Sequence, residues 1–131
     1  MTRVLDASVV VAALVDQGPD GRWAEAELLN AHLAAPHLLP VEVANILRRM
    51  ARAGQISGDI AALAHDDLLR LPVELFPYEP VAARAWELRP NLTSYDAWYV
   101  ALAEQLDAPV ATLDTRLRGA VGPTCAFRTP P

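Results

Sequence analysis

Short apolar runs alternate along the chain with longer segments whose apolar residues recur three and four positions apart. Runs of the first kind are typical of buried strands, and segments of the second kind are typical of helices packed on one side. The predicted strands are Thr2–Leu5, Leu33–Ala35, Val73–Phe76, Pro109–Thr112 and Thr124–Phe127. The predicted helices are Asp20–His32, Val41–Ala53, Ser57–Leu71, Pro80–Leu88, Ser94–Leu106, Thr115–Ala120 and the mainly apolar Ala7–Val15.

Strands separated by helices predict a mostly parallel sheet that is covered on both faces. Because the strand segments are short, the sheet is expected to be small. The fold class is therefore a three-layer α/β/α sandwich. A chain of 131 residues has room for one core, so residues 1–131 are expected to form a single domain.

Composition excludes two classes of protein. With 53% hydrophobic and 21% charged residues, the chain is not of the disordered type. Its longest apolar runs, Val9–Val15 and Ala97–Ala103, are much shorter than the roughly twenty residues that cross a bilayer. No membrane association is expected. The single cysteine, Cys125, can form no intrachain disulfide, which favours a reducing cytoplasm.

Charge narrows the chemistry further. The net charge of −5 argues against a protein that binds nucleic acid by simple electrostatic attraction. The chain contains eleven basic residues, all arginine, and no lysine. A phosphate-binding P-loop and Schiff-base catalysis both require a lysine, so both are excluded.

Four acidic residues stand where a predicted strand ends or a predicted helix begins. Asp6 ends the first strand, Asp114 follows the strand at 109–112, and Glu42 and Asp96 lie in first helical turns. Ligands of parallel α/β folds bind beyond the C-terminal ends of the strands. Each carboxylate also has a simpler explanation, because acidic side chains favour helix N-termini.

Asp6 fits the simpler explanation least well. It stands between the apolar pair Val4-Leu5 and the apolar run Val9–Val11, next to surface that is expected to be buried. An unpaired charge is costly there. A solvated strand end remains the alternative.

The four carboxylates together predict a cation site. Carboxylates that converge on one cleft repel one another and raise one another's pKa values. A hard divalent cation such as Mg²⁺ relieves that repulsion and takes oxygen ligands. Such an ion can bind a phosphate oxygen and activate a water molecule. The chemistry that this pattern indicates is hydrolysis of a phosphate ester.

The segments that carry these acids resemble the four motifs of the PIN-domain ribonucleases, in order, helix placement and chain length. The segments are Val4-Leu5-Asp6-Ala7-Ser8, Val41–Leu47 (VEVANIL), Ser94–Glu104 (SYDAWYVALAE) and Ala111–Leu117 (ATLDTRL). The last two, together with the chain length, are similar to the VapC-type toxins of bacterial toxin–antitoxin pairs.

The resemblance implies an endoribonuclease that depends on Mg²⁺ or Mn²⁺ and hydrolyses RNA phosphodiesters by means of metal-activated water. Asp6, Glu42, Asp96 and Asp114 carry over as the catalytic and metal-binding residues. One or two ions could occupy such a site. The products would have 5′-phosphate and 3′-hydroxyl ends.

Polar residues beside the acids are candidates for supporting roles. Ser8 and Asn45 match polar positions next to the family's site, and Thr112 is a further candidate. Asn45 lies one helical turn from Glu42, so both side chains can face one cleft; an exposed helix residue is the alternative. Arg116 begins near the proposed cleft and is a candidate for holding an RNA phosphate, against the alternative of a solvated charge.

The apolar helices between residues 7 and 71 contain more Leu, Ala and Val than one small sheet needs. An exposed part of that surface could bind the helix of a partner. In VapC-type toxins the partner is a small antitoxin that covers such a groove and blocks the acidic site. The resemblance also implies a homodimer.

Three other functions remain open at this stage. The first is RNA processing by a PIN-like domain outside a toxin system, and the second is a degenerate domain that only binds. The third is a Mg²⁺-dependent phosphatase of the haloacid-dehalogenase type. That class places an acid two residues after its nucleophile, where this chain has Ser8, and normally uses a lysine, which this chain lacks.

Overall fold

A computed structural model describes all 131 residues and contains one five-stranded sheet. Its strands are β1 (Thr2–Leu5), β2 (His32–Pro36), β3 (Val73–Phe76), β4 (Val110–Ala111) and β5 (Phe127–Arg128). They are hydrogen-bonded in the order β3-β2-β1-β4-β5, and every neighbouring pair is parallel. The first strand of the chain is thus the central strand of the sheet.

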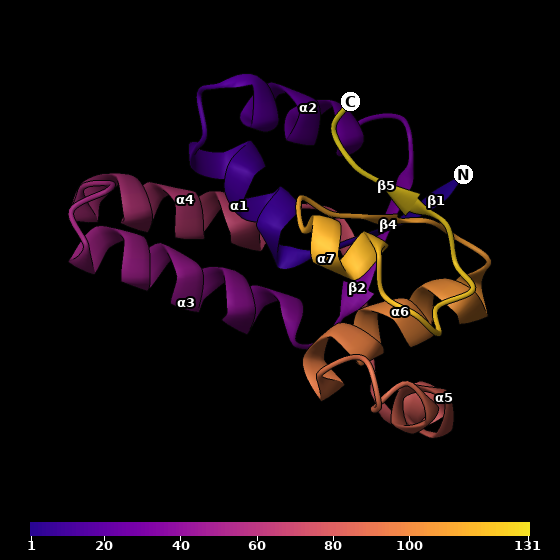
Figure 1. Cartoon of the computed structure of the whole chain (residues 1–131). Helices are drawn as coiled ribbons and strands as arrows, with labels where there is room; N and C mark the ends of the chain where they lie inside the picture. Colours follow the sequence, from indigo (N-terminus) through magenta and orange to yellow (C-terminus); the bar gives the residue numbers. More distant parts are fainter.

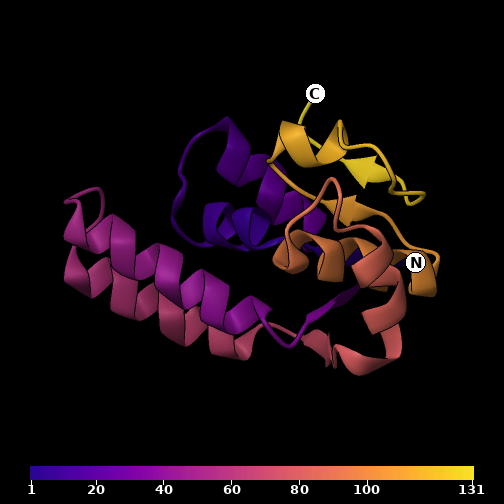
Figure 2. The ribbon, with the colours of Figure 1, turned by 60° about the horizontal axis from the view of Figure 1, so that its bottom comes forward.

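Helices cover this sheet in a three-layer α/β/α arrangement (Figure 1). They are α1 (Ala7–Val15), α2 (Pro19–Glu27), α3 (Leu39–Arg52), α4 (Gly58–Arg70), α5 (Ala82–Glu87), α6 (Ser94–Leu106) and α7 (Thr115–Arg118), with a 3₁₀ turn, η1 (Glu79–Val81), before α5. Helix α6 packs on β1, β2 and β4 and is backed by α5, whereas α1 to α4 pack on one another. Figure 2 shows α3 and α4 lying side by side as a hairpin that extends away from the sheet.

Burial explains the apolar segments. Val4 and Leu5 of β1 are fully buried, and they belong to one core cluster with residues of α1, α3 and α6. Helix α1 is apolar all round because it contacts α2, α3 and α4 and belongs to the core of the sheet. None of the helices combines the length and the apolar character that crossing a bilayer requires.

Local chemistry sets the helix boundaries. Ser57 caps α4 by accepting a hydrogen bond from the Ile60 N–H (3.1 Å), and Thr93 caps α6 through the Asp96 N–H (3.2 Å). In its first turn, α2 needs a glycine where it meets the end of α1. A Cβ atom on Gly21 would lie 1.8 Å from the Asp16 carbonyl oxygen, so any side chain there would force the two segments apart.

The structure confirms the order of the predicted elements but moves several boundaries. The sheet is wholly rather than mostly parallel. The second helix begins at Pro19 and ends at Glu27, well before His32, because Asn30 takes a left-handed backbone (φ 60°) that turns the chain into β2. The last strand lies at 127–128 rather than at 124–127, and α7 ends at Arg118.

A buried ion-pair network ties both chain ends to α2. Glu27 is 4% exposed. Its carboxylate receives two hydrogen bonds from Arg128 on β5 (2.5 and 3.0 Å) and lies 3.3 Å from Arg3 on β1. Arg3 also donates to the Glu27 carbonyl oxygen (2.8 Å). The buried Glu27 carboxylate therefore balances the charge of two guanidinium groups, those of Arg3 and Arg128.

Replacing that carboxylate should destabilise the fold. We expect Glu27→Gln to lower the free energy of unfolding by about 3 kcal/mol, because it leaves the buried Arg3 without its counter-charge. Urea denaturation measures this difference. The matched control is Glu74→Gln, which removes an exposed pair with His32 (2.8 Å) and should change stability by less than about 0.5 kcal/mol. Equal effects of the two substitutions would contradict the assigned role of Glu27.

Candidate active site

The sheet order brings the predicted acids to one edge. Asp6 directly follows the central strand β1, and Asp114 follows β4, which neighbours β1. Glu42 lies in the first turn of α3, the helix that follows β2 on the other side of β1. Asp96 lies in the first turn of α6, which packs on these strands. All four acidic residues therefore lie at the carboxyl-end edge of the sheet, where α/β folds bind ligands.

Asp6 is held by three donors. Its Oδ1 accepts from the Ala7 N–H (2.8 Å), so Asp6 also caps α1. Its Oδ2 accepts from the Ser8 hydroxyl (2.9 Å) and from the Thr112 hydroxyl (2.7 Å). These contacts fix the orientation of the carboxylate at the end of β1.

The same two hydroxyls hold the loop after β4. Ser8 Oγ accepts from the Leu113 N–H (3.1 Å), and Thr112 Oγ1 accepts from the Asp114 N–H (3.0 Å). Each hydroxyl thus donates to Asp6 and accepts from the loop that carries Asp114. Ser8 and Thr112 therefore link two of the acids across the sheet, and their supporting role in catalysis stays a prediction.

Tyr99 is a residue of this site that the sequence pattern did not single out. It is 1% exposed, and its hydroxyl donates to Glu42 Oε1 over 2.6 Å. Burial, followed by the bond to Glu42, raises the pKa of Tyr99 far above its usual value, so the hydroxyl stays protonated. The available sequence signal was its position one helical turn after Asp96. Its partner Glu42 is 57 residues away along the chain, a distance that periodicity does not bridge.

The carboxylates act on one another electrostatically. Burial raises the pKa of Glu42; the hydrogen bond from Tyr99 opposes that rise, and the charges of Asp6 and Asp96 add to it. Burial likewise raises the pKa of Asp96, with further contributions from Asp6 and Asp114. These interactions connect all four acids, so they form one cluster of negative charge.

Asp114 differs from the others because Arg116 compensates its charge. Burial pushes the pKa of Asp114 up, but hydrogen bonds and charge from Arg116 outweigh burial, and the net pKa is lowered. Asp114 Oδ1 accepts from the Arg116 N–H (2.9 Å) and lies 3.4 Å from its Nε. Asp114 is thus also the N-cap of α7. The Arg116 side chain is 92% exposed.

Asn45 is not joined to the four acids by any hydrogen bond. It is exposed on α3, and its amide oxygen accepts a long bond from Arg48 (3.5 Å). A supporting role for Asn45 stays a prediction.

The donor set suits a hard cation by its chemistry, since all four groups are carboxylates with mutual repulsion to relieve. No three His, Cys, Asp or Glu side chains are close enough together to form a ready-made metal cage. Mg²⁺ does not require such a cage, because it keeps several waters and binds through one or two carboxylates plus substrate phosphate. One or two of Asp6, Glu42 and Asp96 would bind the ion directly, and the other acids, including Asp114, would lie beside it.

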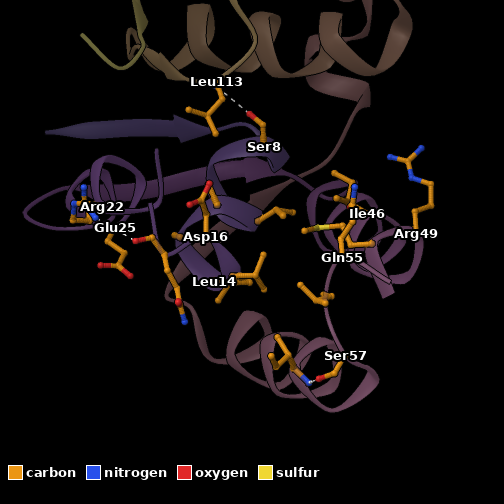
Figure 3. A pocket seen from close by; sticks show the side chains of 18 of the residues that line it. Ser8, Leu14, Asp16, Arg22, Glu25, Ile46, Arg49, Gln55, Ser57 and Leu113 are labelled. Atoms are coloured by element: carbon orange, nitrogen blue, oxygen red, sulfur yellow. Dashed lines mark hydrogen bonds between the residues drawn. The ribbon is translucent and has the colours of Figure 1, made fainter. Parts of the chain in front are cut away.

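A groove of about 1420 Å³ adjoins the site. Figure 3 shows it between α1 and α2 on one side and α3 and α4 on the other, with the Leu113–Ser8 hydrogen bond at one end. Its walls are largely apolar, and polar side chains such as Arg22, Glu25 and Arg49 stand at the rim. Ser8 therefore belongs to both the groove and the acid cluster.

Comparison with known proteins identifies the family. The family model described as PIN domain matches residues 3–122. Ribonuclease VapC1 of Mycobacterium tuberculosis is 40% identical over 126 residues, which cover 95% of each chain. Ribonuclease VapC9 of the same organism is 40% identical over 114 residues, 87% of each chain. The chain belongs to the PIN domain family, among the VapC proteins.

Solved structures agree on the fold. A chain of VapBC2 from Rickettsia felis, bound to a DNA fragment from its promoter, superposes with a TM-score of 0.70 at 17% identity, covering 98% of each chain. VapC20 of M. tuberculosis, described as a toxin that cleaves the sarcin–ricin loop, gives a TM-score of 0.68 at 14% identity, covering 89% of this chain and 93% of that one.

The Thr112 hydroxyl should stabilise the junction of β1 and β4. Thr112 is fully buried. Thr112→Val keeps its shape but leaves the Asp114 N–H unpaired and removes a donor from Asp6, so we expect a loss of about 1–3 kcal/mol in the free energy of unfolding. Thr112→Ser keeps the hydroxyl and should lose only about 1 kcal/mol through the missing methyl group. Denaturant titration measures both, and a valine variant more stable than the serine variant would contradict the assignment.

Proposed function

We propose that this protein is an endoribonuclease of the VapC type that hydrolyses RNA phosphodiesters with Mg²⁺ or Mn²⁺ and acts as the toxin of a toxin–antitoxin pair. The observation that carries the proposal is the convergence of Asp6, Glu42, Asp96 and Asp114 on the carboxyl edge of a parallel sheet. Support also comes from its relatives, which are named as ribonucleases and are 40% identical over most of the chain.

Each residue of the site has a distinct task in this proposal. The divalent cation, when bound, would polarise the scissile phosphate and favour a hydroxide nucleophile at neutral pH. Asp6, braced by Ser8 and Thr112, holds its carboxylate fixed for that ion. Glu42 would share that ion with Asp6, and Asp96, whose pKa is raised by burial, is suited to accept a proton from the attacking water.

Contacts to RNA would come from Arg116. Its guanidinium is exposed at the edge of the cluster, and its charge lowers the pKa of Asp96 in opposition to the acids. A cation at that position can hold a phosphate that the negative cluster would otherwise repel. The proposed reaction is cytoplasmic, since RNA and the free thiol of Cys125 both fit a reducing compartment.

The groove provides a place for an antitoxin. It is apolar, open and bounded by helices, and an amphipathic helix fits such a surface. Because Ser8 and Leu113 line its end, a segment that fills the groove would also reach the neighbourhood of Asp6. Binding there would block the acid cluster. Self-association of the chain stays a prediction.

Loss of one carboxylate should abolish RNA cleavage. We expect Asp6→Asn and Asp96→Asn each to reduce the rate at least about 100-fold, because an amide neither binds the cation nor accepts a proton as a carboxylate does. The assay uses purified protein, structured RNA and Mg²⁺ or Mn²⁺, with small phosphate monoesters as the competing substrate. Products should carry 5′-phosphate ends. Undiminished cleavage in EDTA, or preferred hydrolysis of monoesters, would overturn the proposed activity.

Two exposed residues of α4 test whether an antitoxin binds in the groove. Ile60 lines the groove, whereas Leu63 on the same helix does not. The probe is the product of a short gene immediately upstream, co-expressed with the chain. We expect Ile60→Asp to weaken the complex at least about tenfold while RNA cleavage is kept, and Leu63→Asp to leave the complex intact. An Ile60→Asp variant that binds like the wild type would exclude the groove as the docking site.

A further inference from the structure

The bond between Tyr99 and Glu42 joins two helices that are far apart in sequence. Tyr99 lies on α6, and its ring belongs to the main core cluster. Glu42 lies in the first turn of α3 and is half-buried. The hydroxyl donates to Oε1 over 2.6 Å, a length typical of a charge-assisted bond. A rigid, buried donor thus holds a flexible carboxylate.

The two side chains differ in freedom. The tyrosine ring has two torsions, and both are constrained because the ring is buried in the core. Glu42 has three torsions and is only half-buried, so without a partner it would populate several rotamers. The bond to Tyr99 selects one of them before any ligand arrives. It engages Oε1 and leaves Oε2 available.

A packing explanation is also available for this contact. A buried tyrosine hydroxyl needs an acceptor, and Glu42 could serve only to satisfy it. The two explanations predict different effects of removing the hydroxyl. If Glu42 serves only as the acceptor that the buried Tyr99 hydroxyl needs, then removing this hydroxyl leaves no group unpaired in the core. The position of the Glu42 carboxylate then has no effect on the site. If Tyr99 orients Glu42, removing the hydroxyl releases the carboxylate.

We propose that Tyr99 is a positioning residue of the acid cluster, which acts through Glu42 by presenting one carboxylate oxygen to the divalent cation. This inference rests on the proposed function and adds a residue to it. Helix α6 then contributes two groups from one face, Asp96 directly and Tyr99 one turn later through Glu42. Partners that orient metal-binding carboxylates in this way typically contribute about 10–100-fold to cation affinity or activity.

The chain provides a matched control on the same helix. Tyr95 lies one turn before Tyr99, next to Asp96, and is 61% exposed with no hydrogen bond to its hydroxyl. Tyr95→Phe and Tyr99→Phe each remove one phenolic oxygen from α6, and both positions lie within one helical turn of Asp96. Only the second removes the bond to Glu42.

The experiment compares these two variants of the full chain with the wild type. The first measurement is a Mn²⁺ titration followed by thermal unfolding, which gives the half-saturating Mn²⁺ concentration without any turnover. The second is the unfolding midpoint without metal. The third is kcat and KM for cleavage of a single-stranded RNA.

For Tyr99→Phe we expect the half-saturating Mn²⁺ concentration to rise about tenfold and kcat to fall about 10–100-fold. KM for RNA should stay close to the wild-type value, because Tyr99 is buried and does not contact the substrate. The unfolding midpoint without metal should fall only moderately, because the ring and its packing are kept and a single hydrogen bond is lost. Tyr95→Phe should behave as the wild type in all three measurements.

Three results would overturn the inference. They are a Tyr99→Phe variant that binds Mn²⁺ and cleaves RNA like the wild type, equal effects of both variants, and a wild type that Mn²⁺ does not stabilise at all. Failure of the proposed function has a different signature. If the wild type binds Mn²⁺ but cleaves no RNA, the ribonuclease assignment fails, while the Mn²⁺ titration still decides whether Tyr99 positions Glu42.

Discussion

Repulsion among carboxylates is the constraint on which the candidate site depends. Asp6, Glu42, Asp96 and Asp114 come from four different segments and act on one another at one edge of the sheet. Folding brings these charges together at a free-energy cost, and only Asp114 has a basic partner, Arg116. A cluster of this kind stores unfavourable electrostatic energy that a cation or a captured proton relieves. The fold stabilises the arrangement elsewhere, through the buried apolar strand β1 and the apolar helix α1.

Hydrogen bonds to hydroxyl groups hold the cluster in place. Ser8 and Thr112 donate to Asp6 and accept from the loop after β4, and Tyr99 donates to Glu42. Neutral donors orient a carboxylate without cancelling its charge, whereas an arginine would compete with a bound cation. The strong ion pairs lie elsewhere, at Glu27 and at Glu104 with Arg84 (2.6 Å). Apart from the pair of Asp114 and Arg116, the chain thus uses full charge pairing for stability and hydroxyl donors for the site.

The groove and the acid cluster share residues, which links two otherwise separate surfaces. Ser8 contacts Asp6 through its hydroxyl and also lines the groove. Leu113 lines the groove too, and its backbone N–H donates to the Ser8 hydroxyl (Figure 3). Helix α3 carries Glu42 near its start and the groove residues Ile46 and Met50 further along. A ligand of the groove therefore touches the elements that hold the carboxylates.

The sequence by itself determined the order of the elements, the α/β/α class and the positions of the four acids at strand ends and helix starts, because periodicity, capping residues and strand ends are local properties of the chain. It extended α2 too far, to His32 instead of Glu27, and placed the last strand too early, because the left-handed turn at Asn30 and the pairing of β5 with β4 depend on tertiary contacts. On α5, Trp86 is 61% exposed and stacks on Arg89 instead of packing into the core. Only the tertiary structure decided the sheet order, the groove and the partner of Tyr99, because Glu42 and Tyr99 meet across 57 residues of chain through packing that no local pattern encodes.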